Sequence, residues 1–164
     1  MIEKTFPITE KLLATGLTST QRLLELLNKE FEYLKQTGPA AQLSAVAEEK
    51  KEAVIQLEQF SRQLGQILAT EKLGMRPEDI TDYFSRAKKA NIDTEQSWRC
   101  WDDIMALSKK CRAINEQNGA SIALLSRHTQ RTLQILRGKS QLTATYGPDG
   151  FTRSVLFSHT LISV

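Results

Sequence analysis

Histidine and cysteine are the side chains of this chain that most readily do chemistry near neutral pH, and each occurs twice. His128 lies among basic and amide residues of a predicted helix, and we interpret it as a solvated surface residue; His159 lies close to the C-terminal end. Cys100 and Cys111 are 11 positions apart on one predicted helix, too far for a bridge between them. We interpret both cysteines as small apolar residues of a helix seam.

Catalytic motifs are missing from the sequence. It contains no HExxH, CxxC, P-loop or GxSxG pattern, and its carboxylates alternate with Lys and Arg as on a solvated helix face. Zinc would need four converging ligands, which two cysteines on one helix do not supply. We therefore expect no enzyme activity, no cofactor and no metal site.

A long predicted helix over residues 94–137 carries the most informative pattern. Its seam is apolar at the start and is then interrupted by Asn115, Asn118, Gly119, Thr129 and Thr132. Either buried Asn sets the register of a bundle, or this stretch lacks a permanent partner inside the chain. In the second case its apolar residues form a groove for another protein's amphipathic helix. Those residues are Ile114, Ile122, Leu125, Leu133 and Leu136.

The composition favours long helices in an all-α fold. Only 8 Gly and 4 Pro occur in 164 residues, and the length fits a single domain spanning residues 1–164. We predict an elongated antiparallel helical hairpin or bundle with coiled-coil-like helices and a flexible C-terminal tail. The predicted helices cover about 19–36, 42–73, 77–89 and 94–137, and the tail covers 139–164. Thr18 or Ser19 is the predicted cap of the first helix, and residues 1–17 are expected to fray.

The second predicted helix has a heptad pattern. Eight positions between residues 43 and 67 fit one a/d register, and Lys50 is the one polar residue among them. A 3.5-residue period over four heptads indicates helix packed along helix. The first alternative function is therefore a structural coiled-coil protein that associates with itself through this seam. The tail pieces 142–146 and 151–157 are β-prone and predict either a hairpin or a mobile segment.

Charge divides the chain. Residues 1–103 carry 14 basic and 17 acidic side chains, whereas residues 104–164 carry 8 basic and 2 acidic ones. A basic half leaves nucleic-acid binding as a second alternative, although no aromatic residues stand among the basic ones for base stacking. Attraction to acidic protein partners is the interpretation that we favour.

The chain is expected to reside in the cytoplasm. No run of 18 or more apolar residues occurs, so we expect no direct membrane insertion. The first residues lack the basic start and apolar core of a secretory signal. Two cysteines without a disulfide framework fit a reducing compartment.

Several short motifs, taken in order, resemble the FlgN family. A charged heptad helix and a break are followed by a long helix with Trp101, then Asn115-x-x-Asn118-Gly119-x-x-Ile122 and Leu133-x-x-Leu136. Tyr146-Gly-Pro-Asp-Gly150 comes next. The resemblance covers about residues 15–150. Residues 151–164 depart from it, because a more polar tail is expected there.

The resemblance implies a cytosolic flagellar type III export chaperone that is all-α and has no catalytic role. Its partners would be the hook-associated proteins of the hook–filament junction, held by their C-terminal amphipathic helix, and the flagellar export apparatus. The substrate-binding part would be residues 110–138, and Tyr146 would contribute to docking on the export gate. The expected partner-binding residues are Ile114, Asn118, Gly119, Ile122, Leu125, Leu133, Leu136 and Tyr146.

Overall fold

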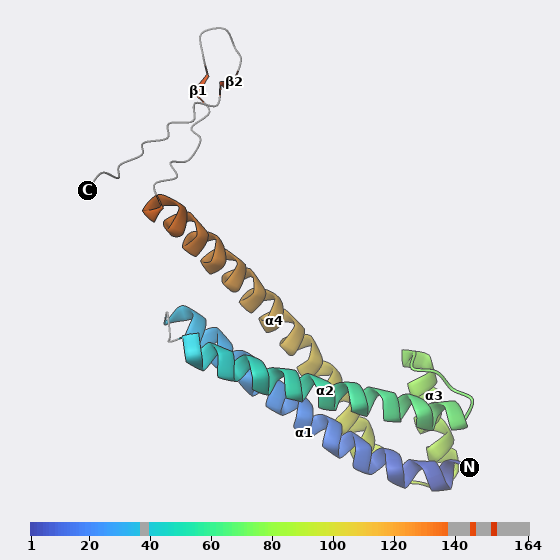
Figure 1. The fold of residues 1–164 in the computed structure, drawn as a ribbon. Helices are drawn as coiled ribbons and strands as arrows, with labels where there is room; N and C mark the ends of the chain where they lie inside the picture. Colours follow the sequence, from blue (N-terminus) through green and yellow to red (C-terminus); the bar gives the residue numbers. More distant parts are fainter. Residues whose placement is uncertain (37–39, 138–144, 147–151, 154–164) are drawn as a thin grey trace. The chain divides into compact units, whose positions relative to one another are not determined.

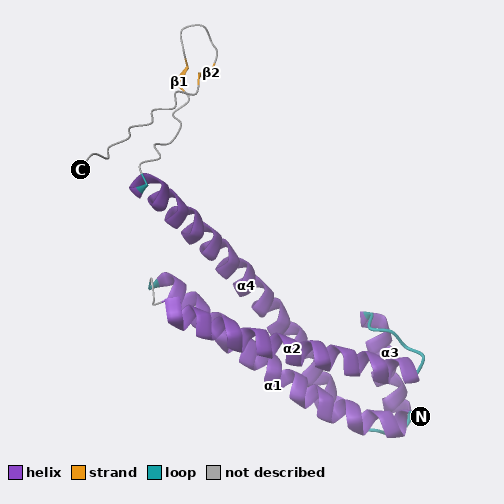
Figure 2. Cartoon of the chain, viewed as in Figure 1, coloured by secondary structure: helices purple, strands orange, loops and turns teal. Residues whose placement is uncertain are grey.

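Four long or medium helices make up most of the described chain (Figure 1). The computed structural model describes residues 1–36, 40–137, 145–146 and 152–153. The helices are α1 (Ile2–Lys35), α2 (Ala40–Thr70), α3 (Pro77–Lys89) and α4 (Glu95–Leu136). Figure 2 shows how little of the described chain is not helical. The predicted all-α fold with long helices is confirmed.

Two strands of two residues each follow the helices. β1 (Thr145–Tyr146) and β2 (Thr152–Arg153) pair antiparallel, with Thr145 opposite Arg153 and Tyr146 opposite Thr152. This pairing agrees with the hairpin alternative from the sequence. The turn between the strands and residues 154–164 lie outside the described residues, as does the predicted flexibility of the tail.

Contacts within the chain group into two compact units, Met1–Ala120 and Ser121–Val164. Helix α4 contributes to both, so each unit is described by itself. In the first unit, α1 and α2 lie side by side and run in opposite directions (Figure 1), which is the predicted antiparallel hairpin. That the whole chain is a single domain stays a prediction.

Helix α1 begins much earlier than its sequence pattern indicates. The prediction that residues 1–17 fray is wrong, because α1 begins at Ile2. Its buried face continues the later seam back to the start at steps of three and four residues, through Phe6, Thr9, Leu13, Gly16 and Thr20. Three of these five are Thr or Gly, which an apolar pattern does not detect.

The predicted cap residues of α1 lie in the helix interior. Thr18 donates its hydroxyl to the carbonyl of Ala14 at 3.1 Å, and Ser19 is buried. Neither side chain caps a first turn, so this prediction is also wrong. A hydroxyl that bonds back to the preceding turn satisfies its own polar group and leaves the helix intact.

Two turns with a residue in the left-handed region end α2 and α3. Lys72 has φ 59°, and the amide of Leu73 donates to the carbonyl of Leu68 at 2.9 Å. Asn91 has φ 58°, and the amide of Ile92 donates in the same way to Ala87 at 3.1 Å. Both are Schellman turns. Helix α2 therefore ends at Thr70, about one turn before the predicted end near Gly74.

The main core lies where α1, the end of α2, α3 and the start of α4 meet. Its buried members are Phe6, Leu13, Phe60, Leu64, Leu68, Ile80, Tyr83, Phe84, Ala87 and Ile104. The ring of Phe84 meets that of Trp98 edge to face at a centroid distance of 4.9 Å, a favourable aromatic geometry. The hydroxyls of Tyr83 and Thr9 lie 2.8 Å apart, so the buried phenol has a hydrogen-bond partner.

The heptad seam of α2 packs inside the same chain. Val46, Ala53, Phe60 and Leu64, all in the predicted register, are buried. Val46 and Ala53 form a second, smaller core with Leu26 of α1. The predicted helix-along-helix packing is therefore confirmed. Within the described residues, no helix has the length and apolar character needed to cross a membrane.

Gly16 provides a test of this packing. A Cβ built on Gly16 would lie 2.5 Å from Cε2 of Phe60, whose ring is buried and cannot easily move away. Gly119 of α4 is the matched control, because a Cβ there would meet nothing within 4 Å. Both replacements by Ala gain about 1 kcal/mol of helix propensity, and the one at Gly16 also overpacks the core.

We expect Gly16→Ala to be less stable than Gly119→Ala by about 1–3 kcal/mol in the free energy of unfolding. Urea denaturation of the two variants measures this difference. Equal stabilities would mean that Phe60 does not pack on the backbone of α1.

Candidate partner-binding surface

The first half of α4 buries residues spaced seven apart, of which Cys111 and Asn118 contact α1. Ser97, Ile104, Cys111 and Asn118 are its buried residues. This spacing is one position of a heptad, and it brings one side chain every two turns to the same face of the helix. The predicted seam is buried at the position of Ile104, Cys111 and Asn118. At its other position, Trp101 is half-buried and Ser108 and Asn115 are exposed.

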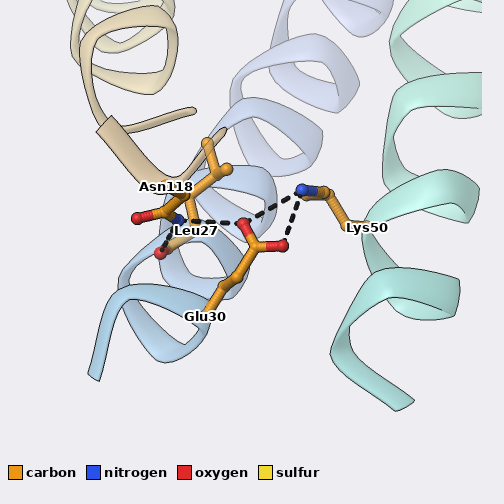
Figure 3. Close-up of polar contacts among 4 residues, drawn as sticks. All are labelled: Leu27, Glu30, Lys50 and Asn118. Carbon is orange, nitrogen blue, oxygen red and sulfur yellow. Dashed lines mark hydrogen bonds and ion pairs between the residues drawn. The ribbon is translucent and has the colours of Figure 1, made fainter. Parts of the chain in front are cut away.

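Asn118 joins a buried polar cluster to which three helices contribute. Its side-chain amide donates to the carbonyl of Leu27 at 3.0 Å and to Oε2 of Glu30 at 2.9 Å. Lys50 of α2 approaches the same carboxylate, with its ammonium 2.9 Å from Oε1 and 3.0 Å from Oε2. Figure 3 shows the Glu30 carboxylate between the Asn118 amide and the Lys50 ammonium.

This cluster explains two polar residues that interrupt apolar seams. Lys50 is the polar member of the α2 heptad, and Asn118 is only 1% exposed. Each donates to Glu30, whose side chain is 4% exposed, and a carboxylate so deeply buried is costly unless it is paired and hydrogen-bonded. Among the described residues, Oδ1 of Asn118 has no hydrogen-bond partner, so the amide is held through its nitrogen.

Beyond Ala120, the apolar residues of α4 are exposed. The exposed fractions are 45% for Ile122, 41% for Leu125, 44% for Leu133 and 77% for Leu136. We call these four residues the α4 stripe. With Thr129 between them, they follow steps of three or four residues and so lie on one helix face. A protein surface of this kind marks a site for another protein more often than single scattered apolar residues do.

The other predicted partner-binding residues lie in different environments. Ile114 is half-buried, Asn118 is buried and bonded inside the first unit, and Gly119 is exposed. Of the two interpretations that the sequence left open, register-setting fits Asn118, and a surface without a partner fits the α4 stripe. Tyr146 lies in β1, and its side chain is outside what the structure describes.

Beyond Ala120, two further large apolar residues of α4 are exposed that were not among the predicted partner-binding residues. Leu124 is 54% exposed and Ile135 is 66% exposed. Both lie off the a/d register that defined the predicted seam, on another face of α4. No pattern in the sequence distinguishes them from residues that pack inside a fold.

The described helix beyond Ala120 is basic. Residues 121–137 contain Arg127, Arg131 and Arg137 and no Asp or Glu. A helix of one sign of charge attracts surfaces of the opposite sign and speeds their encounter. The charge of this segment therefore suits an acidic partner.

Cys111 is a buried free thiol, and Cys100 is a half-buried one. Burial raises the pKa of the Cys111 thiol, so the thiol stays protonated near neutral pH. Its Sγ lies 3.9 Å from the carbonyl of Thr20. In the described parts of the chain, no three His, Cys, Asp or Glu residues are grouped so that they could hold a metal ion.

The polar cluster predicts a large cost for removing its cation. Lys50→Met leaves the Glu30 carboxylate buried without its counter-charge, and we expect a loss of about 3–5 kcal/mol in the free energy of unfolding. The double variant Lys50→Met with Glu30→Leu removes both charges and should be more stable than the single one. Urea denaturation measures both.

Lys51→Met is the matched control, because Lys51 is the exposed neighbour of Lys50 on α2. Its effect should stay within about 0.5 kcal/mol. A double variant no more stable than Lys50→Met would show that the carboxylate is not held by this lysine.

Comparison with known proteins identifies the family. The family model described as FlgN protein matches residues 7–154, which is most of the chain. No match was found among curated proteins or among solved structures. The matched region includes all four helices apart from the first residues of α1, and it includes the polar cluster, the α4 stripe and both strands. The chain belongs to the FlgN family, and this membership indicates a flagellar export chaperone in general.

Proposed function

We propose that this protein is a cytoplasmic flagellar type III export chaperone for the hook-associated proteins of the hook–filament junction. It holds their C-terminal amphipathic helix, prevents premature assembly and delivers them to the export gate. The observation that carries the proposal is the α4 stripe, four large apolar side chains that are 41–77% exposed in a chain of the FlgN family.

The stripe suits a helical client because of its spacing. Ile122, Leu125, Leu133 and Leu136 lie along one face of α4, as the anchor residues of a helix-in-groove complex do. A client helix laid along this face would cover its own apolar side and the stripe together. Both surfaces are then removed from water, which favours association.

Charge supports the same mode of binding. Residues 121–137 carry three arginines and no carboxylate, so a client helix with acidic residues beside its apolar face would be attracted. Such attraction acts mainly on the rate of encounter and on the choice of partner. The apolar contacts would then set the residence time.

We assign delivery to the export gate to the C-terminal tail, residues 139–164. Tyr146, in β1, is the residue that we propose to contribute to docking on the gate's cytoplasmic domain. Neither step needs a catalytic group or a cofactor, and we propose that the protein is not an enzyme. Binding and releasing a client are equilibria. They need only a difference in affinity for the client between two states of the system, and no chemical step.

Self-association through the α2 seam is less well supported. The residues that it would use, Val46, Ala53, Phe60 and Leu64, are already buried within this chain. A second copy could reach them only if α1 moved away. The seam therefore supplies stability and leaves little apolar surface for a homotypic coiled coil.

We expect Ile122→Asp to weaken client binding strongly, by about thirtyfold or more, as loss of an interface hot spot does. The variant should leave the thermal midpoint nearly unchanged, because Ile122 is 45% exposed in the free chain. Pull-down from flagellated cells, followed by affinity measurement with each recovered junction protein, tests this.

Ile135→Asp is the matched control, since Ile135 is an exposed isoleucine of the same helix outside the stripe. It should bind clients as the wild type does. Recovery of no hook–filament junction protein, or equal binding by both variants, would contradict the proposed site.

A further inference from the structure

A groove of about 280 Å³ opens on the first unit, Met1–Ala120, where three helices meet. Helix α1 contributes Thr20, Leu23 and Leu27, and α2 contributes Lys50, Val54 and Leu57. Helix α4 contributes Ser108, Cys111, Arg112 and Asn115. We call it the three-helix groove. The α4 stripe does not belong to it.

The groove has the length and periodicity of a helix-binding site. On α1 and α2 its lining residues follow steps of three or four, and on α4 they lie at i, i+3, i+4 and i+7. On each helix the first and last lining residues are seven positions apart. Seven residues make two helical turns, about 10.5 Å. An amphipathic helix presents its anchor side chains at the same steps, i, i+3 or i+4 and i+7. The groove therefore matches the apolar face of one further helix.

The floor of the groove is apolar and already formed in the free chain. Leu27 is 1% exposed and Cys111 is 5% exposed, so both side chains lie at its base. Burial keeps the Cys111 thiol uncharged by raising its pKa. Val54, at the rim, is 40% exposed. An incoming apolar side chain would thus meet a preformed surface and cover an exposed valine.

The charges that a partner would meet at the groove are positive. The lining contains two cations, Lys50 and Arg112, and no carboxylate. Lys50 is already paired with the buried Glu30. Arg112 is exposed and makes no ion pair within the described residues. The complementary partner is a helix with large apolar residues on one face and an Asp or Glu at the edge of that face.

We propose that the three-helix groove is a second seat for the exported client and takes an acidic amphipathic helix of the junction protein. This inference rests on the proposed function and extends it from the α4 stripe to the helical unit. The bound helix packs on α1, α2 and α4 and fills the fourth position of a helical bundle. Its acidic residue pairs with Arg112.

The Asn-x-x-Asn-Gly motif fits this arrangement. Asn118 points into the core and bonds to Leu27 and Glu30, whereas Asn115 lines the groove. Gly119 follows Asn115 by four residues and so lies on the same face of α4. A Cβ on Gly119 would meet nothing within 4 Å, so packing within the chain does not require a glycine there. A partner helix that packs closely against α4 would be a reason for a glycine at this position.

The test compares two neighbouring residues of α2. Val54 lines the groove and is 40% exposed, and Ile55 is 45% exposed and lies outside it. Each hook–filament junction protein of the same organism is titrated with the full-length wild type, Val54→Glu and Ile55→Glu. We expect Val54→Glu to weaken binding by about tenfold or more, and Ile55→Glu to change it by less than about twofold. Thermal melts should show both variants folded.

A second pair tests the charge. Arg112→Glu should weaken binding, and replacing the client's acidic edge residue by Lys should restore it. Lys109→Glu is the control, because Lys109 is an exposed cation of α4 that does not line the groove. It should bind as the wild type does. Restoration by the charge swap is a result that a folding defect could not produce.

Each possible result of these titrations supports or contradicts the proposed client seat. If the wild type binds a junction protein and Val54→Glu binds equally well, the groove is not a client seat, and the proposed function still stands. If the wild type binds no junction protein, the proposed function fails and this inference fails with it. If the wild type sediments as a dimer that Val54→Glu dissociates, the occupant is a second copy and the inference is overturned.

Discussion

The buried carboxylate of Glu30 is the constraint on which the arrangement of the helices depends. A carboxylate that is 3% exposed as a residue must be paired and hydrogen-bonded, because its desolvation would otherwise cost several kcal/mol or more. Lys50 and Asn118 satisfy it from two other helices. Apolar side chains can slide along a seam at little cost, but these bonds exist in one register only. The cluster therefore fixes where α2 and α4 lie along α1.

Fixing that register determines which surface is left for partners. One heptad position of α4 is buried from Ser97 to Asn118, and the apolar residues that follow Ala120 are exposed. The last buried contact of this series is thus polar and specific. A longer apolar seam would bury more area and stabilise the fold further, but it would leave nothing to bind a client. Exposed apolar side chains at regular helical steps are a surface that suits an amphipathic helix of another protein.

The α4 stripe and the three-helix groove would contribute to the binding of a helix in different physical ways. The α4 stripe offers large exposed side chains on a basic helix. The three-helix groove offers a preformed apolar floor between helices that the polar cluster holds in place. A preformed site loses less conformational freedom on binding than a site that must be ordered. The groove is therefore suited to selecting a helix by shape, whereas the stripe offers apolar area without such a preformed shape.

The sequence by itself determined the all-α class and the approximate bounds of α2, α3 and α4, because these follow from helical periodicity and from Gly and Pro at the breaks. It also named the four residues of the α4 stripe, but it left open whether they are buried or exposed. It also identified Lys50 and Asn118 as polar interruptions. It failed at the start of α1, whose seam is built from Thr9, Gly16 and Thr20 as much as from apolar residues. Tertiary structure alone decided that Lys50 and Asn118 meet at Glu30, and that Asn115 and Asn118 face different surroundings. It also brought three helices together around one groove. These features depend on which residues distant in sequence lie side by side, and local periodicity carries no information about that.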